Sequence, residues 1–285
     1  MENRSSLLKI MDKLADIEAL VIGDVMLDRF VYGRASRISP EAPIPILSIT
    51  HQSQMPGGAG NVVRNIASLG GRARLVSVVG EDAEGIELEA LFKTHNAMMP
   101  HLVKSVGRPT TVKTRFIADG QQLLRGDHEA SHPLQPKTAG NVLKTFQEVA
   151  TSADIIVLSD YAKGVLSDTV LRHVIAHAKG KGIPVIADPK SRDFSRYAGV
   201  TLLTPNRKEM VAASGMPCDT NYQVEEAARS LIAKAGISAI LVTRSEAGMS
   251  LVTADEAHHI RAEAQEVFDV SGAGDSVVAA LALAF

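Results

Sequence analysis

The sequence predicts an α/β protein in which helices cover both faces of a mostly parallel β-sheet. Short apolar runs rich in β-branched residues alternate with amphipathic segments along most of the chain. We expect strands at residues 19–23, 74–79, 154–159, 183–188, 200–204 and 239–243, and helices at about 59–69, 83–95, 137–149, 167–181, 206–214 and 223–236. This alternation is typical of parallel sheets, because neighbouring parallel strands need a crossover connection between them.

Length and composition limit the classes of protein to consider. The chain has 285 residues, 45% of them hydrophobic, and a net charge of −2, which suits one large α/β domain or two small ones. No basic tract favours nucleic acid or an anionic membrane as a partner. Cys218 is the single cysteine, residues 1–18 carry charges throughout, and no apolar run reaches 18 residues. We therefore expect a cytoplasmic protein without a disulfide, a signal peptide or a membrane span.

Two segments, 29–56 and about 107–128, interrupt the alternation of strands and helices. They contain short alternating runs, at 44–49 and 111–117, with no helical segment between them. Such runs indicate antiparallel strands that project from the main sheet. These strands are expected to form a lid over a site at the carboxyl ends of the parallel strands, an oligomer contact, or both.

The stretch from Phe268 to Ser276 contains Gly272, Ala273, Gly274 and Asp275 directly before an apolar helical run. Small residues there let backbone N–H groups converge on an anion at a helix N-terminus. A carboxylate fixed beside them can take a proton from a hydroxyl that attacks phosphorus. The alternative is a small-residue turn in which Asp275 caps the helix.

Polar and glycine-rich stretches follow the first strand. Asp24 and Asp28 come directly after it, where they can accept hydrogen bonds from sugar hydroxyls or belong to an ordinary solvated loop. Gly57 and Gly58 deliver exposed N–H groups into a helix start, and Asn61 adds a donor and an acceptor. This run lacks the Lys-Ser/Thr of a Walker A loop and the spacing of a dinucleotide-binding fingerprint.

Further candidates are cations and a helix start. Arg115, Arg125 and Lys163 stand among apolar or small neighbours, and together they can hold an anionic group or simply lie on the surface. Asn206 and Glu209 are three residues apart at a helix start. They can orient water around a metal or phosphates, or they form a capping box.

Residues 128–132 match the zinc-protease string H-E-x-x-H. Zinc binding would need both histidines on one face of a sustained helix. Pro133 follows at once and Pro136 soon after, so no such helix is expected and the metalloprotease interpretation is rejected.

Taken together, these motifs resemble the ribokinase-like (PfkB) carbohydrate kinases. The run from Gly57 to Gly70 with Gly80 looks like the first signature of that family, and 269–275 looks like the second. The motifs at 80–85 and 206–209 fit in order between them, so the resemblance covers essentially the whole chain as a single kinase domain, 1–285. The strings at 37–43, 121–125, 158–164 and 242–249 resemble its D-glycero-β-D-manno-heptose-7-phosphate kinase branch.

The resemblance implies ATP- and Mg²⁺-dependent phosphorylation of the heptose anomeric hydroxyl, in ADP-heptose and lipopolysaccharide core synthesis. It makes Asp275 the catalytic base and Gly272, Ala273 and Gly274 the anion hole. The sugar-binding residues are implied to be Asp24, Asp28, Gly57, Gly58 and Asn61. The nucleotide-side residues are implied to be Asn206, Lys208, Glu209, Thr243, Arg244, Ser245 and Gly248, with Glu209 reaching Mg²⁺ through water. We infer from charge and position that Arg115, Arg125 and Lys163 hold the substrate phosphate, with Arg34 and Arg37 as competitors.

The resemblance also implies that helices and a strand follow the Gly-Ala-Gly-Asp helix, but the chain ends at Phe285. We therefore expect the C-terminal helices of the family fold, and any nucleotidyltransferase domain, to be missing. Two alternatives stay open: a kinase of the ribokinase or 1-phosphofructokinase type, and a truncated sugar- or nucleotide-binding module without catalysis. The projecting lid also predicts a homodimer.

Overall fold

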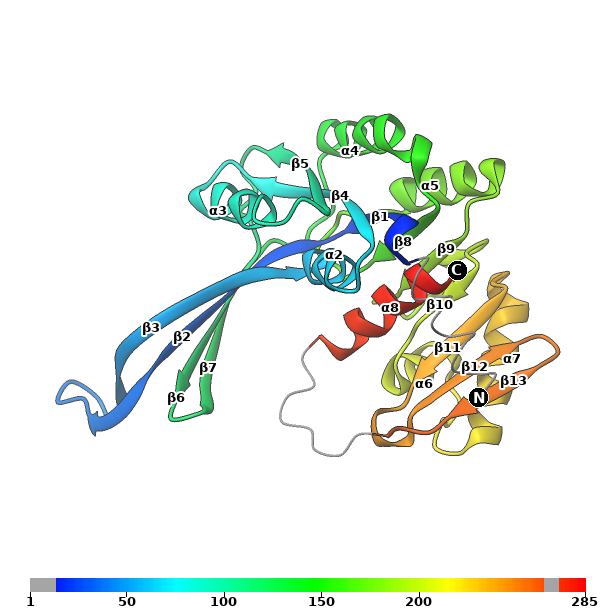
Figure 1. Cartoon of the computed structure of the whole chain (residues 1–285). Coiled ribbons are helices and arrows are strands. Elements are labelled where there is room, and N and C mark those ends of the chain that lie inside the picture. Colours follow the sequence, from blue (N-terminus) through cyan, green and yellow to red (C-terminus); the bar gives the residue numbers. More distant parts are fainter. Residues whose placement is uncertain (1–13, 264–271) are drawn as a thin grey trace.

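The computed structural model describes residues 14–263 and 272–285 of the chain. Within these residues, nine strands form one sheet in the order β13-β12-β11-β10-β9-β8-β1-β4-β5 (Figure 1). Its strands are β1 (Glu18–Gly23), β4 (Arg72–Gly80), β5 (Met98–Ser105), β8 (Ile155–Ser159), β9 (Val185–Asp188), β10 (Leu202–Leu203), β11 (Ala239–Thr243), β12 (Met249–Thr253) and β13 (Ala257–Ile260). The seven strands β11-β10-β9-β8-β1-β4-β5 pair in parallel, and β12 and β13 add two antiparallel strands next to β11. The predicted fold class, a mostly parallel sheet flanked by helices, is confirmed.

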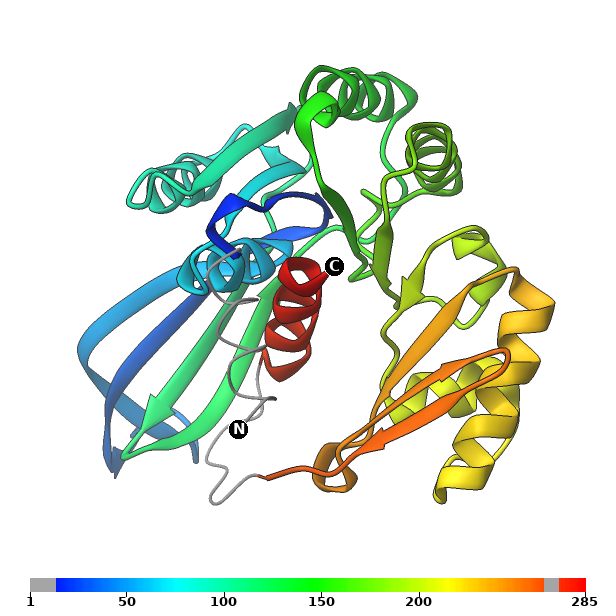
Figure 2. The ribbon, with the colours of Figure 1, turned by 45° about the vertical axis from the view of Figure 1, so that its right-hand side comes forward.

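Helices cover the two faces of this sheet in separate layers. The helices are α2 (Ala59–Ser68), α3 (Ala83–Phe92), α4 (Pro136–Val149), α5 (Asp168–Lys181), α6 (Arg207–Ser214), α7 (Asn221–Ala235) and α8 (Ala273–Ala284). Buried residues of α4, α5, α6 and α7 pack into one hydrophobic cluster, and those of α2, α3 and α8 pack into the other. Helices α2 and α8 therefore lie side by side although more than 200 residues separate them (Figure 2).

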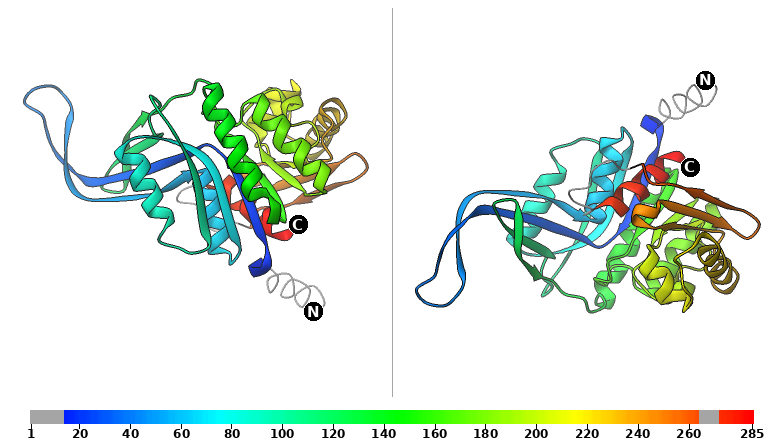
Figure 3. Two further views of the ribbon diagram at one scale, coloured as in Figure 1. Left: turned by 90° about the horizontal axis from the view of Figure 1, so that it is seen from above. Right: turned by 90° about the horizontal axis from the view of Figure 1, so that it is seen from below.

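The second, smaller sheet is formed by the two segments that were predicted to make a lid, and we refer to it as the lid. In the described part of the chain it has the order β3-β2-β6-β7, from β2 (Val25–Ile38), β3 (Pro45–Gly58), β6 (Val112–Ala118) and β7 (Gln121–His128). The pair β2 and β3 extends far from the main sheet (Figure 3). Only Asp24 separates β1 from β2, and β3 runs directly into α2, so the lid is continuous with the elements that border the candidate site.

The expected helices and strands occur, with boundaries shifted by a few residues. The lid strands begin earlier than residue 29 and end later than residue 56, because β2 and β3 pair all the way back to Val25 and Gly58. Three strands were not predicted: β5 at one edge of the main sheet, and β12 and β13 at the other end. Among the described helices, none has the length and apolar character needed to cross a bilayer.

Candidate active site

Acidic and polar side chains gather where the parallel strands end. Asp24 follows β1, Tyr161 lies two residues beyond β8, and Asp188 closes β9. Asp275 stands in the first turn of α8 and reaches the same edge of the sheet. In α/β folds, ligands bind at the carboxyl ends of the parallel strands. The fold and the polar residues therefore indicate the same candidate site.

The carboxylate of Asp275 is buried and held by two donors from different elements. Asn61 Nδ2 donates to Oδ2 at 2.6 Å, and the Tyr161 hydroxyl donates to Oδ1 at 2.6 Å. The side chain is only 6% exposed. Asp275 is the third residue of α8, after the N-cap Gly272, so the alternative that Asp275 is itself the cap does not describe the structure.

Burial and hydrogen bonding act on Asp275 in opposite directions. Desolvation raises its pKa, since a charged carboxylate is disfavoured away from water, and nearby Asp28 raises it further. The hydrogen bonds from Asn61 and Tyr161 and the charge of Arg64 lower it. The net shift is upward, which makes Asp275 a stronger proton acceptor than an exposed aspartate.

The start of α8 offers uncapped backbone N–H groups. Gly272 has a left-handed φ of 79° and supplies no side-chain cap, and Ala273 and Gly274 are exposed. A Cβ on Gly272 would lie 2.7 Å from Asn61 Nδ2, so glycine lets the turn approach Asn61 closely. A helix N-terminus of this kind favours an anion, and Asp275 lies within its first turn.

Gly57 and Gly58 end β3, and Gly57 packs against the carboxylate of Asp28. A Cβ on Gly57 would lie 2.0 Å from Asp28 Oδ2, and Gly58 has a φ of 57°. Asp28 Oδ1 in turn accepts a hydrogen bond from Arg115 Nη1 at 2.6 Å, and this guanidinium lies over the ring of Phe30. The structure therefore brings Gly57, Asp28 and Arg115 together beside Asp275.

One buried acceptor in this cluster has no partner. Asn61 Oδ1 is buried and accepts no hydrogen bond among the described residues, while Asn61 Nδ2 is bound to Asp275. A buried acceptor without a donor costs free energy. A sugar hydroxyl in this place would supply the missing donor, which fits the expected role of Asn61.

Asp24 differs from its expected role in sugar binding. Its side chain is 2% exposed, and its two oxygens accept backbone N–H groups from Tyr161, Lys163 and Val165, each at 3.0 Å. Desolvation raises its pKa despite these bonds. Its contacts assign Asp24 to holding the loop after β8 rather than to a ligand.

The three cations expected at the substrate phosphate lie at different depths. Lys163 Nζ pairs with Glu129 at 2.6 Å, and Lys113 pairs with the same carboxylate at 3.4 Å. Arg115 pairs with Asp28, as above. Arg125 faces Arg115 across the β6–β7 pair, but it lies on the exposed edge strand β7 and pairs with Asp127 at 2.8 Å. Lys113 was not predicted.

The residues expected on the nucleotide side form local structure at the ends of β10 and β11. Asn206 and Glu209 make a capping box at the start of α6, so that alternative is confirmed. Lys208 is exposed in the same first turn, and Thr243 is bridged to Asn206. Ser245 and Gly248 both have left-handed φ angles in the turn after β11.

Arg244 departs from the expectation of nucleotide binding. Its guanidinium is buried and donates to Asn221, Ser250 and the carbonyl oxygen of Asp219. It therefore ties α7 to β12. In this segment, the backbone of the turn from Ser245 to Gly248 is then the candidate for contact with a nucleotide.

Asp188 is a site residue that sequence reasoning missed. Burial, then the charges of Glu209 and Asp275, raise its pKa to about 7, while Thr204 donates to it at 3.1 Å. Its position at the end of a predicted parallel strand was the available signal. Tyr161 was missed too, although it lies within a string that carries the family resemblance.

Asp188 and Glu209 fit a magnesium ion carried by a nucleotide. Both offer carboxylate oxygens, the ligand type that Mg²⁺ prefers, and their mutual repulsion in the structure is what a cation would relieve. The described residues contain no group of three or more metal-type side chains. Mg²⁺ usually keeps several waters and binds phosphate oxygens, so it needs only one or two protein carboxylates.

The H-E-x-x-H string forms no metal site in the described structure. His128 ends β7, and residues 129–132 form no helix. Glu129 pairs with Lys113 and Lys163 instead. The expectation that these residues form no sustained helix is confirmed.

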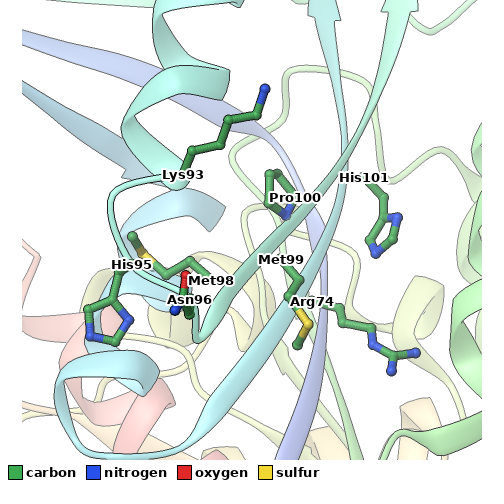
Figure 4. Close-up of a pocket in the computed structure, with 8 residues that line it drawn as sticks. All are labelled: Arg74, Lys93, His95, Asn96, Met98, Met99, Pro100 and His101. Atoms are coloured by element: carbon green, nitrogen blue, oxygen red, sulfur yellow. The ribbon is translucent and has the colours of Figure 1, made fainter.

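A surface hollow lies elsewhere, away from the cluster at Asp275. It has a volume of about 510 Å³ and is lined by Arg74, Met98, Pro100 and His101 with their neighbours (Figure 4). These residues belong to the amino-terminal halves of β4 and β5. They are at the opposite end of the strands from Asp275, so this hollow is separate from the acidic cluster.

The cluster at Asp275 has the parts that phosphoryl transfer to a hydroxyl needs: a buried base, an anion-binding helix start and a carboxylate pair for a cation. The chain belongs to the pfkB family of carbohydrate kinases, whose family model matches residues 16–285. The expected class, an ATP-dependent sugar kinase, is confirmed.

Within that class, the chain is similar to curated proteins named bifunctional protein HldE. The protein of Gluconacetobacter diazotrophicus is 52% identical over 271 residues, covering 95% of this chain and 56% of the relative. That of Paramagnetospirillum magneticum is 50% identical over 285 residues, covering 100% and 58%. The chain therefore spans little more than half the length of these relatives.

Solved structures share the fold. Phosphofructokinase-2 from Escherichia coli, in complex with substrates and products, superposes with a TM-score of 0.77 at 24% identity, covering 94% of this chain and 85% of that one. Ribokinase from Arabidopsis thaliana, complexed with ribose and ATP, gives a TM-score of 0.69 at 23% identity with the same coverage. Both have the ribokinase-like architecture predicted from the sequence.

Proposed function

We propose that this chain transfers the γ-phosphoryl group of ATP to O1 of D-glycero-β-D-manno-heptose 7-phosphate, giving the 1,7-bisphosphate. The name and similarity of the HldE relatives support this branch of the family. The observation that carries the chemistry is the buried carboxylate of Asp275, held at the start of α8 by donors from α2 and from the loop after β8.

Asp275 acts as the general base. Its upward-shifted pKa makes it a better proton acceptor. Its contact with Asn61, on the helix that directly follows Gly57 and Gly58, supports a position near the proposed sugar. It accepts the O1 proton as O1 attacks the γ-phosphorus. Each carboxylate oxygen has two acceptor sites, so the bonds from Asn61 and Tyr161 leave room for the sugar hydroxyl.

The N–H groups of Gly272, Ala273 and Gly274 stabilise negative charge on the transferring group. They point from a helix start with no side-chain cap, and such fixed dipoles need no rearrangement during the reaction. Asp188 and Glu209 would hold Mg²⁺, which when bound neutralises phosphate charge. Lys190, which pairs with Glu209 at 3.2 Å, adds a positive charge on the same side.

Lys163, Lys113 and Arg115 are the cations we assign to the 7-phosphate. Their side chains are 19%, 14% and 16% exposed, and all three are paired with carboxylates. A phosphate would compete with Glu129 and Asp127 for the two lysines, and with Asp28 for Arg115. Arg125 is a weaker candidate because its side chain is exposed on the edge strand β7.

The lid supports a second expectation, a homodimer. Its exposed apolar residues include Ile38, Ile44, Ile49 and Leu124, and every residue of β7 is exposed. An extended sheet with such a face favours contact with another chain. Light scattering coupled to size-exclusion chromatography tests this contact. We expect the Ile49→Lys variant to shift the measured mass toward that of a monomer.

The activity is tested by supplying ATP, Mg²⁺ and one sugar at a time and measuring ADP release. Heptose 7-phosphate, fructose 6-phosphate, ribose and a blank without sugar form the panel. We expect release above the blank only with heptose 7-phosphate. Equal turnover with fructose 6-phosphate or ribose would refute the substrate. Sugar binding by calorimetry without any ADP release would favour a non-catalytic module.

A further inference from the structure

The loop at residues 160–165, which follows β8, is held from two sides. Asp24 accepts the backbone N–H groups of Tyr161, Lys163 and Val165, as described above. The Arg108 guanidinium donates to the carbonyl oxygens of Lys163, Ala130 and His132. A buried carboxylate and a partly buried guanidinium thus fix the path of six residues.

The backbone of this loop also adopts a conformation that side chains disfavour. Ala162 has a φ of 55° although it carries a Cβ, and its N–H donates to Asp160 Oδ1 at 2.8 Å. Gly164 has a φ of 98°, and a Cβ there would lie 2.6 Å from the carbonyl oxygen of His132. Backbone strain of this kind persists where the surroundings over-determine it, and it gathers at functional sites.

The result of these constraints is the position of one hydroxyl. Tyr161 donates to Asp275 Oδ1 at 2.6 Å, on the oxygen that Asn61 does not bind. Burial and the neighbouring charge of Asp275 raise the pKa of Tyr161 far above its ordinary value. The phenol therefore stays protonated, and remains a donor, throughout the pH range in which proteins are stable.

We propose that Tyr161 is a positioning residue for the transfer, which keeps Asp275 anionic and aimed at the acceptor hydroxyl. This inference rests on the proposed role of Asp275 as base. Removing the donor should raise the pKa of Asp275, since the bond favours the charged form. The other charges that face Asp275 are Asp28 on β2, Asp188 on β9 and Arg64 on α2, and the substitution retains all three.

The test is the pH profile of kcat for Tyr161→Phe, measured with saturating sugar phosphate, ATP and Mg²⁺. We expect the acidic limb to move upward by about one pH unit, the scale set by one hydrogen bond to a charged group. The KM for ATP should stay within about twofold, because the tyrosine acts on the base and not on the nucleotide. Asp188 and the substrate phosphate also titrate in this range, but they are common to all variants and drop out of the comparison.

Tyr197→Phe is the matched control. Tyr197 is a buried tyrosine in the short helix Phe194–Tyr197, and its hydroxyl donates to the buried carboxylate of Asp160 at 2.5 Å. Both substitutions remove one oxygen and leave a buried aspartate short of a donor. We expect Tyr197→Phe to lower the melting temperature without moving the acidic limb.

Two outcomes would overturn the proposal: an unshifted limb in Tyr161→Phe, or an equal shift in Tyr197→Phe. A parallel measurement on Asp275→Asn separates this failure from that of the proposed function. Near-full turnover in Asp275→Asn would refute the proposed role of Asp275 as general base. Loss of turnover there, with an unshifted limb in Tyr161→Phe, would refute the role of Tyr161 alone.

Discussion

Gly57→Ala tests how tightly the lid is fitted to the candidate site. The new Cβ would lie 2.0 Å from Asp28 Oδ2 and 2.6 Å from its Cγ. This is roughly 1.5 Å short of van der Waals contact, so the carboxylate must move. Asp28 is also bound to Arg115 at 2.6 Å, in a pair whose side chains are 13% and 16% exposed. The movement therefore disturbs a mostly buried ion pair, and with it a carboxylate proposed to bind the sugar.

The expected loss of sugar affinity follows from the displacement of Asp28 in this ion pair. A hydrogen bond to a charged group contributes about 1.5–3 kcal/mol, so displacing the Asp28 carboxylate from a sugar hydroxyl should raise the sugar KM roughly 10- to 100-fold. Overpacking should lower stability by about 1–3 kcal/mol. We expect kcat to fall less than KM rises, because Asp275 and its two donors lie outside the clash.

The assay is steady-state ADP release over a range of sugar phosphate, with a melting curve for each variant. Gly126→Ala on β7 is the control, since no atom lies within 4 Å of its new Cβ. If the clash acts through Asp28, Gly57→Ala should add little to Asp28→Ser in the double variant. A wild-type KM and melting temperature for Gly57→Ala would refute the reasoning.

Three further outcomes are expected. Asp275→Asn should lower kcat by roughly 10² to 10⁴, the scale of a positioned base, and a folded variant with near-full turnover would contradict that role. The pKa of Asp188 is raised from 3.8 to about 7, so the stability it contributes is present at low pH and lost as pH rises through 7. The melting temperature of the ligand-free chain should therefore fall less between pH 5 and 8 in Asp188→Asn than in the wild type, and parallel curves would count against this. Lys163→Ala should raise the KM for the sugar phosphate roughly tenfold with the KM for ATP unchanged, whereas an unchanged sugar KM would exclude Lys163 from the phosphate site.

Periodicity in the sequence was sufficient to predict the central strands and the helices. Strands such as β1 and β8 are buried on both faces and read as unbroken apolar runs. The edge strands β5 and β13 carry mixed residues, including Pro100 and His258, because one side of an edge strand meets solvent. Their pattern therefore resembles that of loops, and they were missed.

The candidate site was predicted where a motif carries its own chemistry, as for Asp275 and the glycines. It was missed where position alone gives a residue its role. Nothing near Tyr161 in the sequence indicates that its hydroxyl meets a carboxylate 114 residues later. Asp24 shows the converse, because a carboxylate at a strand end looks free in sequence but is occupied by the backbone of a distant loop.

The junction of the lid with the main sheet has a mechanical consequence. Because β1 and β2 are separated by one residue and β3 runs into α2, the β2–β3 part of the lid joins the main sheet without a connecting loop. Strand β2 has 14 residues, which makes it a lever roughly 45 Å long. A displacement of the far end of β2 is therefore transmitted to the residues where the lid meets the main sheet, which are Asp24, Asp28 and Gly58. Contacts made at the far end of the lid should therefore change the affinity for the proposed sugar substrate.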